Sequence, residues 1–212
     1  MGTIKKGILG GFSGKVGTVV GSNWKQTSYM RSLATKVKNP QTPKQMAHRQ
    51  KFKLMFDYLK PMSPFLKLGF QNYTKKQTAL NAALSYNMKN AVYGTSPNWW
   101  LNTYKVLVTR GNLMPVQHVY FHRNGQYIFM NWGDNSGVGN AKASDLAIAV
   151  MYNTTKGEIR TITAGPERSY KLSGFQIPAD WQDCWIDIHF AFITEDRKEI
   201  SNSVYVGGMK LL

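Results

Sequence analysis

The sequence lacks several features that would assign it to a large class of proteins. It contains one cysteine, Cys184, so it can form no intrachain disulfide and no cysteine-based metal site. No apolar run approaches the length of a membrane span. Near the N-terminus the apolar run Ile8-Leu9 is too short for a signal peptide. We therefore expect a soluble cytoplasmic protein, with assembly into a virion or on a cell surface left open.

Acidic residues are almost absent from the first half of the chain. Residues 1–110 contain 18 lysines and arginines and a single acid, Asp57, whereas residues 111–212 contain 9 basic and 10 acidic residues. The net charge of +16 therefore comes from the first half. A charge distribution this uneven indicates an anionic partner, whether nucleic acid, an acidic protein surface or lipid.

Residue patterns typical of catalysis or metal binding are also missing. The glycine-rich start does not match a phosphate-binding loop, because Gly14-Lys15 is followed by Val16 rather than serine or threonine. His118 and His122 fall on one face of a predicted strand, without the third ligand that a metal site needs. We therefore expect no catalytic residue, no metal and no cofactor, and interpret the protein as non-enzymatic.

Glycine is abundant at the N-terminus, where it makes up seven of the first 21 residues. Such a segment can lie close against a neighbouring surface but builds no core of its own. Residues 18–33 predict a β-hairpin with a four-residue loop at 25–28, which places Trp24 opposite Tyr29. Because an isolated hairpin is marginally stable in water, we expect this arm to dock on another surface. The residues expected to make the contact are Ile4, Ile8, Leu9, Phe12, Trp24 and Tyr29.

Helices are predicted after a basic linker at 36–40. Thr42 is a suitable N-cap, Pro43 suits the first helical position, and Gln45 completes a capping box. A short second helix follows, and a third begins near Thr78. The residues of the first helix that we expect to be buried are Phe52, Met55, Phe56 and Leu59.

After Trp100 the sequence pattern changes from helical to β. Turn signals such as Asn124-Gly125 separate short β-rich runs. Eight runs at this spacing are typical of a sandwich of the immunoglobulin or fibronectin-III type. The sequence thus predicts an α+β chain, with a basic glycine-rich β-hairpin and short helices over residues 1–100 and an all-β sandwich over residues 101–212. The runs are 104–109, 117–121, 126–132, 145–152, 158–163, 168–173, 184–193 and 200–206.

Residues 10–22 read Gly-Gly-Phe-Ser-Gly-Lys-Val-Gly-Thr-Val-Val-Gly-Ser. This motif resembles the opening of an uncharacterised domain-of-unknown-function family from Bacteroidetes, and residues 39–52 and 132–141 resemble two further blocks of that family. The resemblance covers the chain from end to end. It supports the division into a basic part and a sandwich-like part, and implies no activity, cofactor or catalytic residue. The Asn-Pro-x-Thr-x-x-Gln pattern from Asn39 also resembles some phage structural proteins.

Three functions are consistent with these observations. We expect a structural or assembly protein, whose basic arm docks on a partner subunit or an anionic surface to give a homo-oligomer or a complex with another protein. The alternatives are a phage-type structural protein and a nucleic-acid-binding protein that uses the basic half. In the last case basic side chains contact phosphates while Trp24 and Tyr29 stack on bases. The candidate anion-binding residues are Lys15, Lys25, Arg31, Lys36, Lys38, Arg49 and Lys53.

Overall fold

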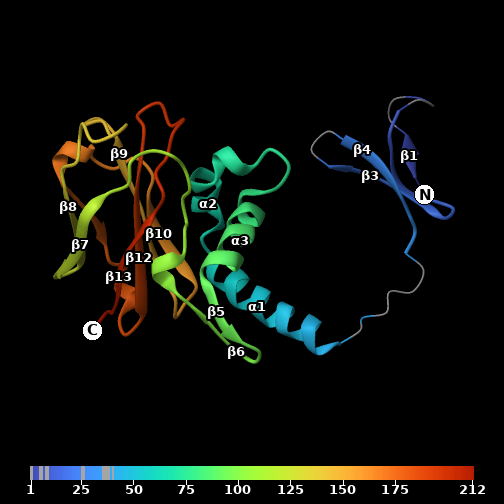
Figure 1. The fold of residues 1–212 in the computed structure, drawn as a ribbon, viewed down its shortest axis with the longest axis horizontal. Coiled ribbons are helices and arrows are strands. Elements are labelled where there is room, and N and C mark those ends of the chain that lie inside the picture. The colour runs from blue at the N-terminus through green and yellow to red at the C-terminus, as the bar shows by residue number, and fades with distance from the viewer. Residues whose placement is uncertain (1, 5–6, 8–9, 25–26, 35–38, 40) are drawn as a thin grey trace. The chain divides into compact units, whose positions relative to one another are not determined.

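The computed structural model describes residues 2–4, 7, 10–24, 27–34, 39 and 41–212 (Figure 1). The chain divides into two compact units, Met1–Thr42 and Pro43–Leu212. Each unit is described by itself below. Five of the candidate residues named above lie outside the described residues, namely Ile8, Leu9, Lys25, Lys36 and Lys38.

The first unit is a four-stranded antiparallel sheet. Its strands are β1 (Thr3–Ile4), β2 (Phe12–Val16), β3 (Val19–Trp24) and β4 (Thr27–Ser32), and they lie in the order β1-β2-β3-β4. Gly17 stands in the turn between β2 and β3 with a φ of 56°, a conformation that glycine adopts without strain. The sequence predicted only the hairpin of β3 and β4, so the pairing of β2 with β3 is an addition from the structure.

The turn between β3 and β4 is tighter than the sequence predicted. Trp24 pairs with Thr27 and Ser22 pairs with Tyr29. The predicted pair of Trp24 opposite Tyr29 is therefore wrong by two positions, and the two rings are diagonal neighbours on one face instead. The sequence could not separate the two registers, because a shift of two residues leaves every side chain on the same face.

The second unit contains three helices and nine strands among the residues that the structure describes. The helices are α1 (Pro43–Leu59), α2 (Ser63–Gly69) and α3 (Ala79–Asn90), with 3₁₀ turns at η1 (Gln71–Tyr73), η2 (Thr103–Lys105), η3 (Arg168–Tyr170) and η4 (Ala179–Trp181). The strands are β5 (Val92–Thr95), β6 (Asn98–Leu101), β7 (Gln117–Asn124), β8 (Tyr127–Gly133), β9 (Leu146–Asn153), β10 (Glu158–Ile162), β11 (Leu172–Gln176), β12 (Trp185–Ile193) and β13 (Val204–Lys210).

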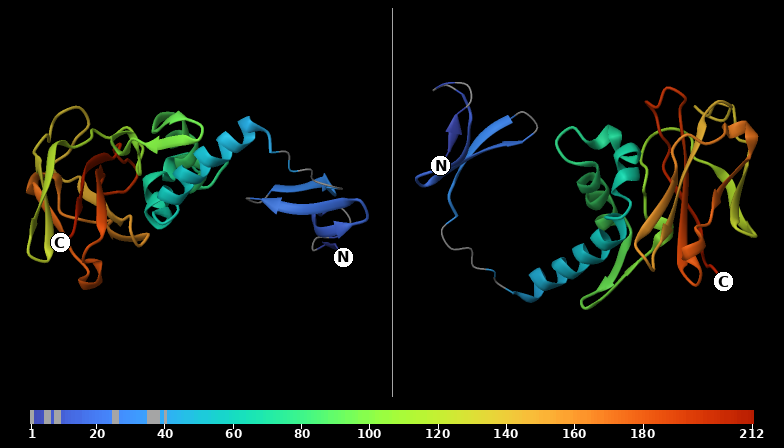
Figure 2. Two further views of the ribbon diagram at one scale, coloured as in Figure 1. Left: turned by 90° about the horizontal axis from the view of Figure 1, so that it is seen from below. Right: turned by 180° about the vertical axis from the view of Figure 1, so that it is seen from behind.

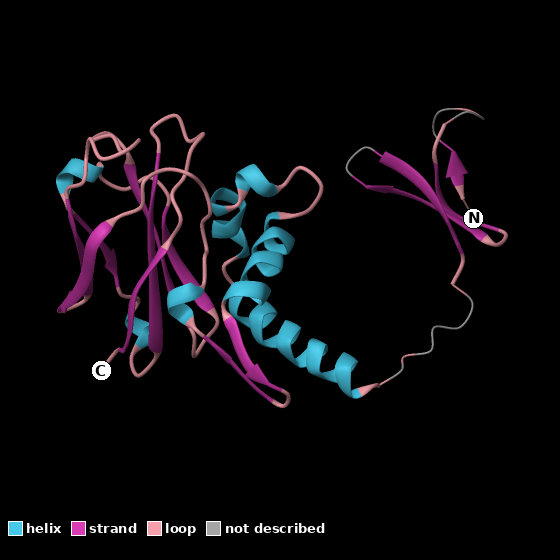
Figure 3. Cartoon of the chain, in the orientation of Figure 1, coloured by secondary structure: helices cyan, strands magenta, loops and turns pink. Residues whose placement is uncertain are grey.

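These elements form three layers (Figures 1 and 2). A three-stranded sheet in the order β11-β8-β7 lies against one face of a four-stranded sheet in the order β10-β9-β12-β13. The helices cover the other face of the four-stranded sheet. In Figure 3, which has the orientation of Figure 1, the helices α1, α2 and α3 lie together on one side of the strands β7–β13, and short 3₁₀ turns lie among those strands.

The four-stranded sheet is therefore buried on both faces. Successive side chains of a strand point to opposite sides. Ile188 and Phe190 of β12 join the core between the two sheets, whereas Ala191 and Ile193 join the core beneath the helices. Between the sheets, the ring of Phe190 lies 4.9 Å from that of Trp132 on β8. A strand with two covered faces reads as a near-continuous apolar run, as β9 does.

The predicted boundary between residues 100 and 101 lies inside this second unit. Leu59 of α1 and Leu66 of α2 share one apolar cluster with Ile148 and Val150 of β9. The helices thus complete the core of the sheet rather than accompany the hairpin. The chain instead divides after Thr42, where the capping signals begin α1.

Several predicted elements differ from those observed. The run at 104–109 is a 3₁₀ turn followed by irregular chain, and the runs at 168–173 and 200–206 form strands that begin four residues later. The sequence missed the hairpin of β5 and β6. In α1, Met55 and Leu59 are buried as predicted, but Phe52 is 41% exposed, and Tyr58 is buried beside them.

Candidate functional site

Two glycines allow β2 to lie close over β3 in the first unit. Gly14 has a φ of 106°, which side-chain-bearing residues rarely adopt, and it pairs with Gly21. A Cβ atom on Gly21 would overlap both the carbonyl oxygen and the ring of Phe12. Phe12 therefore occupies the space above Gly21, which explains why this segment is rich in glycine.

The strand pairing sorts the apolar side chains of this unit onto one face. Val16 pairs with Val19, and Gly21, which lies beneath Phe12, pairs with Met30. Paired residues of adjacent strands point to the same side, and so do residues two apart along a strand. These side chains thus share one surface, which we call the apolar face: Phe12, Val16, Val19 and Met30.

The apolar face is largely uncovered within its own unit. Val16 is 55% exposed and Met30 is 70% exposed. Ile4, which pairs with Phe12, is 53% exposed. Gly21 is the single buried residue among those of the unit that the structure describes. The sheet therefore lacks the second layer that a stable β unit normally has.

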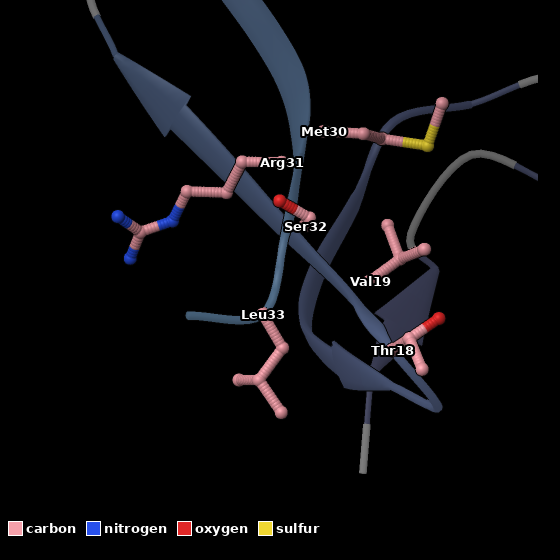
Figure 4. A pocket seen from close by; sticks show the side chains of 6 residues that line it. All are labelled: Thr18, Val19, Met30, Arg31, Ser32 and Leu33. Carbon is pink, nitrogen blue, oxygen red and sulfur yellow. The ribbon is translucent and has the colours of Figure 1, made fainter. Parts of the chain in front are cut away.

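A hollow of about 460 Å³ lies at one end of the apolar face. Figure 4 shows Val19 and Met30 on one side of the β3–β4 pair and Arg31 on the other. The lining supplies apolar and hydroxyl groups with one guanidinium, without an acid, a histidine or a thiol. The hollow therefore suits an apolar side chain. Its lining residues are Thr18, Val19, Met30, Arg31, Ser32 and Leu33.

The opposite face of the sheet carries charge and aromatic rings. Lys15 pairs with Val20, and Val20 pairs with Arg31, so the two cations lie in one row across three strands. Trp24 and Tyr29 lie on the same side and are 50% and 45% exposed. Residues 1–42 contain seven lysines and arginines and no acid. We call this surface the basic–aromatic face: Lys15, Trp24, Tyr29 and Arg31.

The structure thus brings together only part of the predicted anion-binding set. Lys15 and Arg31 share the basic–aromatic face, whereas Arg49 and Lys53 are exposed residues of α1 in the second unit. Lys53 borders a separate hollow of about 310 Å³, which is also lined by Trp99. The described members of the predicted set therefore lie on two surfaces, one in each unit.

Sequence reasoning missed a buried polar cluster between α1 and β12. The Tyr58 hydroxyl donates a 3.1 Å hydrogen bond to Asp187 Oδ2. The Tyr205 hydroxyl and the Trp185 indole N–H donate to Asp187 Oδ1, over 2.9 and 3.2 Å. Asp187 is 4% exposed, so these three donors stabilise its carboxylate in place of water. The available signal was two polar residues, Asp187 and His189, within an apolar strand.

His189 completes the cluster as a neutral ring. Its Nε2 lies 3.0 Å from the Tyr58 hydroxyl oxygen. The Tyr58 hydroxyl gives its one proton to Asp187, so it accepts a hydrogen bond from His189 Nε2. The other ring nitrogen, Nδ1, is then unprotonated, and it has no hydrogen-bond partner. Burial lowers the pKa of His189 to about 3, and burial followed by the charge of Asp187 raises the pKa of Tyr58. These groups are closed to solvent and hold α1 on the sheet.

A second buried polar group, also missed, joins loops at one end of the two sheets. Arg168 is fully buried and donates to Asp145 Oδ2 over 3.0 Å and to Asn135 Oδ1 over 2.6 Å. It also donates to the Met114 carbonyl over 3.0 Å, and its guanidinium lies 3.8 Å from the ring centre of Phe192. These partners occupy Nε and both terminal nitrogens, so Arg168 has a structural role.

A family model described as a family of unknown function (DUF6266) matches residues 11–207. The chain belongs to this family. The match begins at Gly11, so it includes the glycine-rich strands of this DUF6266 protein as well as most of its second unit. No curated protein matches the chain.

Metal-ligand clusters and membrane-spanning helices are both absent from the described part of this DUF6266 protein. It contains no group of three or more side chains placed to hold a metal ion. Among the same residues, no helix is both long enough and apolar enough to cross a bilayer. The N-terminal sheet exposes side chains on both its apolar face and its basic–aromatic face.

Proposed function

We propose that this DUF6266 protein is a non-enzymatic assembly protein that forms homo-oligomers through the apolar face of its N-terminal sheet. The supporting observation is the exposure of Val16 and Met30 on a face that their own unit leaves uncovered. Burying apolar surface stabilises an interface by about 25 cal/mol per Å² before association costs.

The occupant that we propose for this face is the same face of a second copy. Two sheets related by a two-fold axis supply each other's missing layer, as in aligned sheet packing. Lys15 and Arg31 point to the opposite side, so neither of these two cations is desolvated in such an interface. The second unit, with its two packed sheets interpreted as a sandwich of immunoglobulin or fibronectin-III type, serves as the rigid module that the N-terminal sheets join.

The mass of the full-length protein in solution tests this proposal. Light scattering should give a multiple of 24.0 kDa. Met30→Glu, which puts a charge on the apolar face, should reduce the mass to that of the monomer. Thr27→Glu is the matched control, because Thr27 lies on the same strand but faces the other side. A Met30→Glu protein with the wild-type mass contradicts the proposal.

Cross-linking separates a second copy from an occupant within the same chain. The native Cys184 is buried, so Met30→Cys introduces an exposed thiol on the apolar face. A short bis-maleimide should then link two chains, and Thr27→Cys should link few. If the apolar face instead covers part of its own chain, Met30→Cys will give no linked dimer.

A further inference from the structure

The basic–aromatic face is a second interaction surface, separate from the one used in the proposed assembly. We propose that it binds single-stranded nucleic acid, with Trp24 and Tyr29 stacking on bases and Lys15 and Arg31 contacting phosphates. This inference does not rest on the assembly proposal, because it uses the opposite side of the sheet.

Charge is the first reason for this partner. Lys15 and Arg31 lie in one row, joined through Val20 of the strand between them. With seven basic residues and no acid in residues 1–42, no carboxylate of the same segment neutralises them. A cationic row across a sheet can follow a phosphate backbone, and releasing its counterions favours binding at low salt.

The setting of the two rings is the second reason. Trp24 pairs with Thr27, and Tyr29 pairs with Ser22, so each ring has a small hydroxyl side chain opposite it across the hairpin. Neither ring is therefore covered by a bulky cross-strand neighbour, and each is about half exposed. Exposed rings on a sheet surface are stacking platforms for unpaired bases.

The same features argue against a duplex and against a lipid surface. In a duplex the bases stack on one another and leave no face for Trp24 or Tyr29. Insertion into lipid needs aliphatic side chains beside the cations, but the two most exposed aliphatic residues of the unit's described part, Val16 and Met30, lie on the opposite face. Val20, the aliphatic member of the cationic row, is half-buried.

Fluorescence anisotropy of a labelled twelve-nucleotide oligothymidine with the full chain tests the stacking. The double variant Trp24→Ser/Tyr29→Ser should lose affinity by about tenfold or more. The matched control is Tyr93→Ser/Trp100→Ser in the second unit, where the two exposed rings already stack on each other with centroids 5.2 Å apart. The control should retain its affinity, and Trp24→Phe should retain most of it because a phenyl ring still stacks.

The salt dependence tests the phosphate contacts. Lys15→Gln/Arg31→Gln should reduce the slope of log affinity against log salt by about 1.4, because each single-strand phosphate contact contributes about 0.7. Lys75→Gln/Lys76→Gln removes two exposed lysines of the second unit and should leave the slope unchanged. Far-ultraviolet circular dichroism establishes that each variant keeps its fold.

Four results would overturn the inference. These are the absence of oligothymidine binding at low salt, equal affinity for a twelve-base-pair duplex, full affinity in the Trp24→Ser/Tyr29→Ser variant, and binding to phosphatidylserine vesicles without binding to the oligonucleotide. Each result is independent of the oligomer's mass, so this inference and the assembly proposal can fail separately.

Discussion

The hydroxyl of Tyr58 reaches Asp187 across 129 residues of sequence and joins α1 to β12 through a buried hydrogen bond. It lies in the layer where the helices meet the four-stranded sheet. The sequence had divided the chain between these two elements. This contact and the apolar cluster around it make them parts of one folding unit.

Removing that hydroxyl should destabilise the second unit. Tyr58→Phe leaves Asp187 Oδ2 and His189 Nε2 without their shared partner in a buried site. We expect a loss of about 1–3 kcal/mol in the free energy of unfolding, measured with urea. Tyr170→Phe is the control, because Tyr170 is 74% exposed. Equal unfolding midpoints for the two variants would show that the buried hydrogen bond contributes nothing.

Lowering the pH should destabilise the folded protein because of His189. Its pKa is about 3 in the folded chain against 6.5 ordinarily, so the unfolded chain binds the proton first as the pH falls. The contribution of neutral His189 to the free energy of unfolding is complete above about pH 6.5. Below that pH it is lost at about 1.4 kcal/mol per pH unit. Urea unfolding between pH 7.5 and 5 should show this slope. His189→Gln, which cannot titrate, should flatten it, and parallel curves for the two proteins would contradict the assignment.

Arg168 should be among the most sensitive positions. Arg168→Met leaves the Asp145 carboxylate buried without its cation and should cost about 3–5 kcal/mol of stability. Adding Asp145→Asn removes the buried charge and should recover part of that loss. Lys198→Met, which breaks the exposed pair with Asp196, should leave the urea midpoint unchanged. No recovery in the double variant would mean that the uncompensated charge is not the cause.

Two truncations test where the chain divides. A protein of residues 43–212 should unfold in one cooperative transition, because it keeps both apolar cores. A protein of residues 101–212 loses the helices, which exposes Ile148, Val150 and Ile193, and should aggregate or bind a hydrophobic dye. Cooperative unfolding of the shorter protein would instead support the boundary between residues 100 and 101 that the sequence predicted.

The sequence predicted the elements whose signals are local. Pro43 begins α1, and Thr78 caps α3 by accepting a hydrogen bond from the Asn81 N–H, as expected from capping chemistry. The packing of these elements against one another was harder to predict from the sequence. Asp187 and His189 alternate with apolar residues along β12. Nothing in that local pattern indicates that α1 covers their side of the strand or that Tyr58 bonds to both of them.

The N-terminal surfaces were predicted in composition but not in arrangement. The sequence identified Lys15, Arg31, Trp24 and Tyr29 as candidates. It could not place Lys15 and Arg31 in one row, because that row runs through Val20 and needs β2 to pair with β3. That pairing depends on the close approach of Gly14 and Gly21 beneath Phe12. Close backbone approach of this kind depends on tertiary geometry and leaves no periodic pattern.

The place of β12 in the four-stranded sheet determines when the protein can fold during synthesis. The helices of residues 43–90 leave the ribosome before the sheet that they cover. That sheet pairs β9 with β12, and β12 ends only at Ile193. Neither apolar core is complete until nearly the whole chain has been made. A chain released early, before Trp185, therefore leaves one edge of β9 unpaired and both apolar cores incomplete. Such a chain becomes a substrate for chaperones and proteases rather than a shorter working protein.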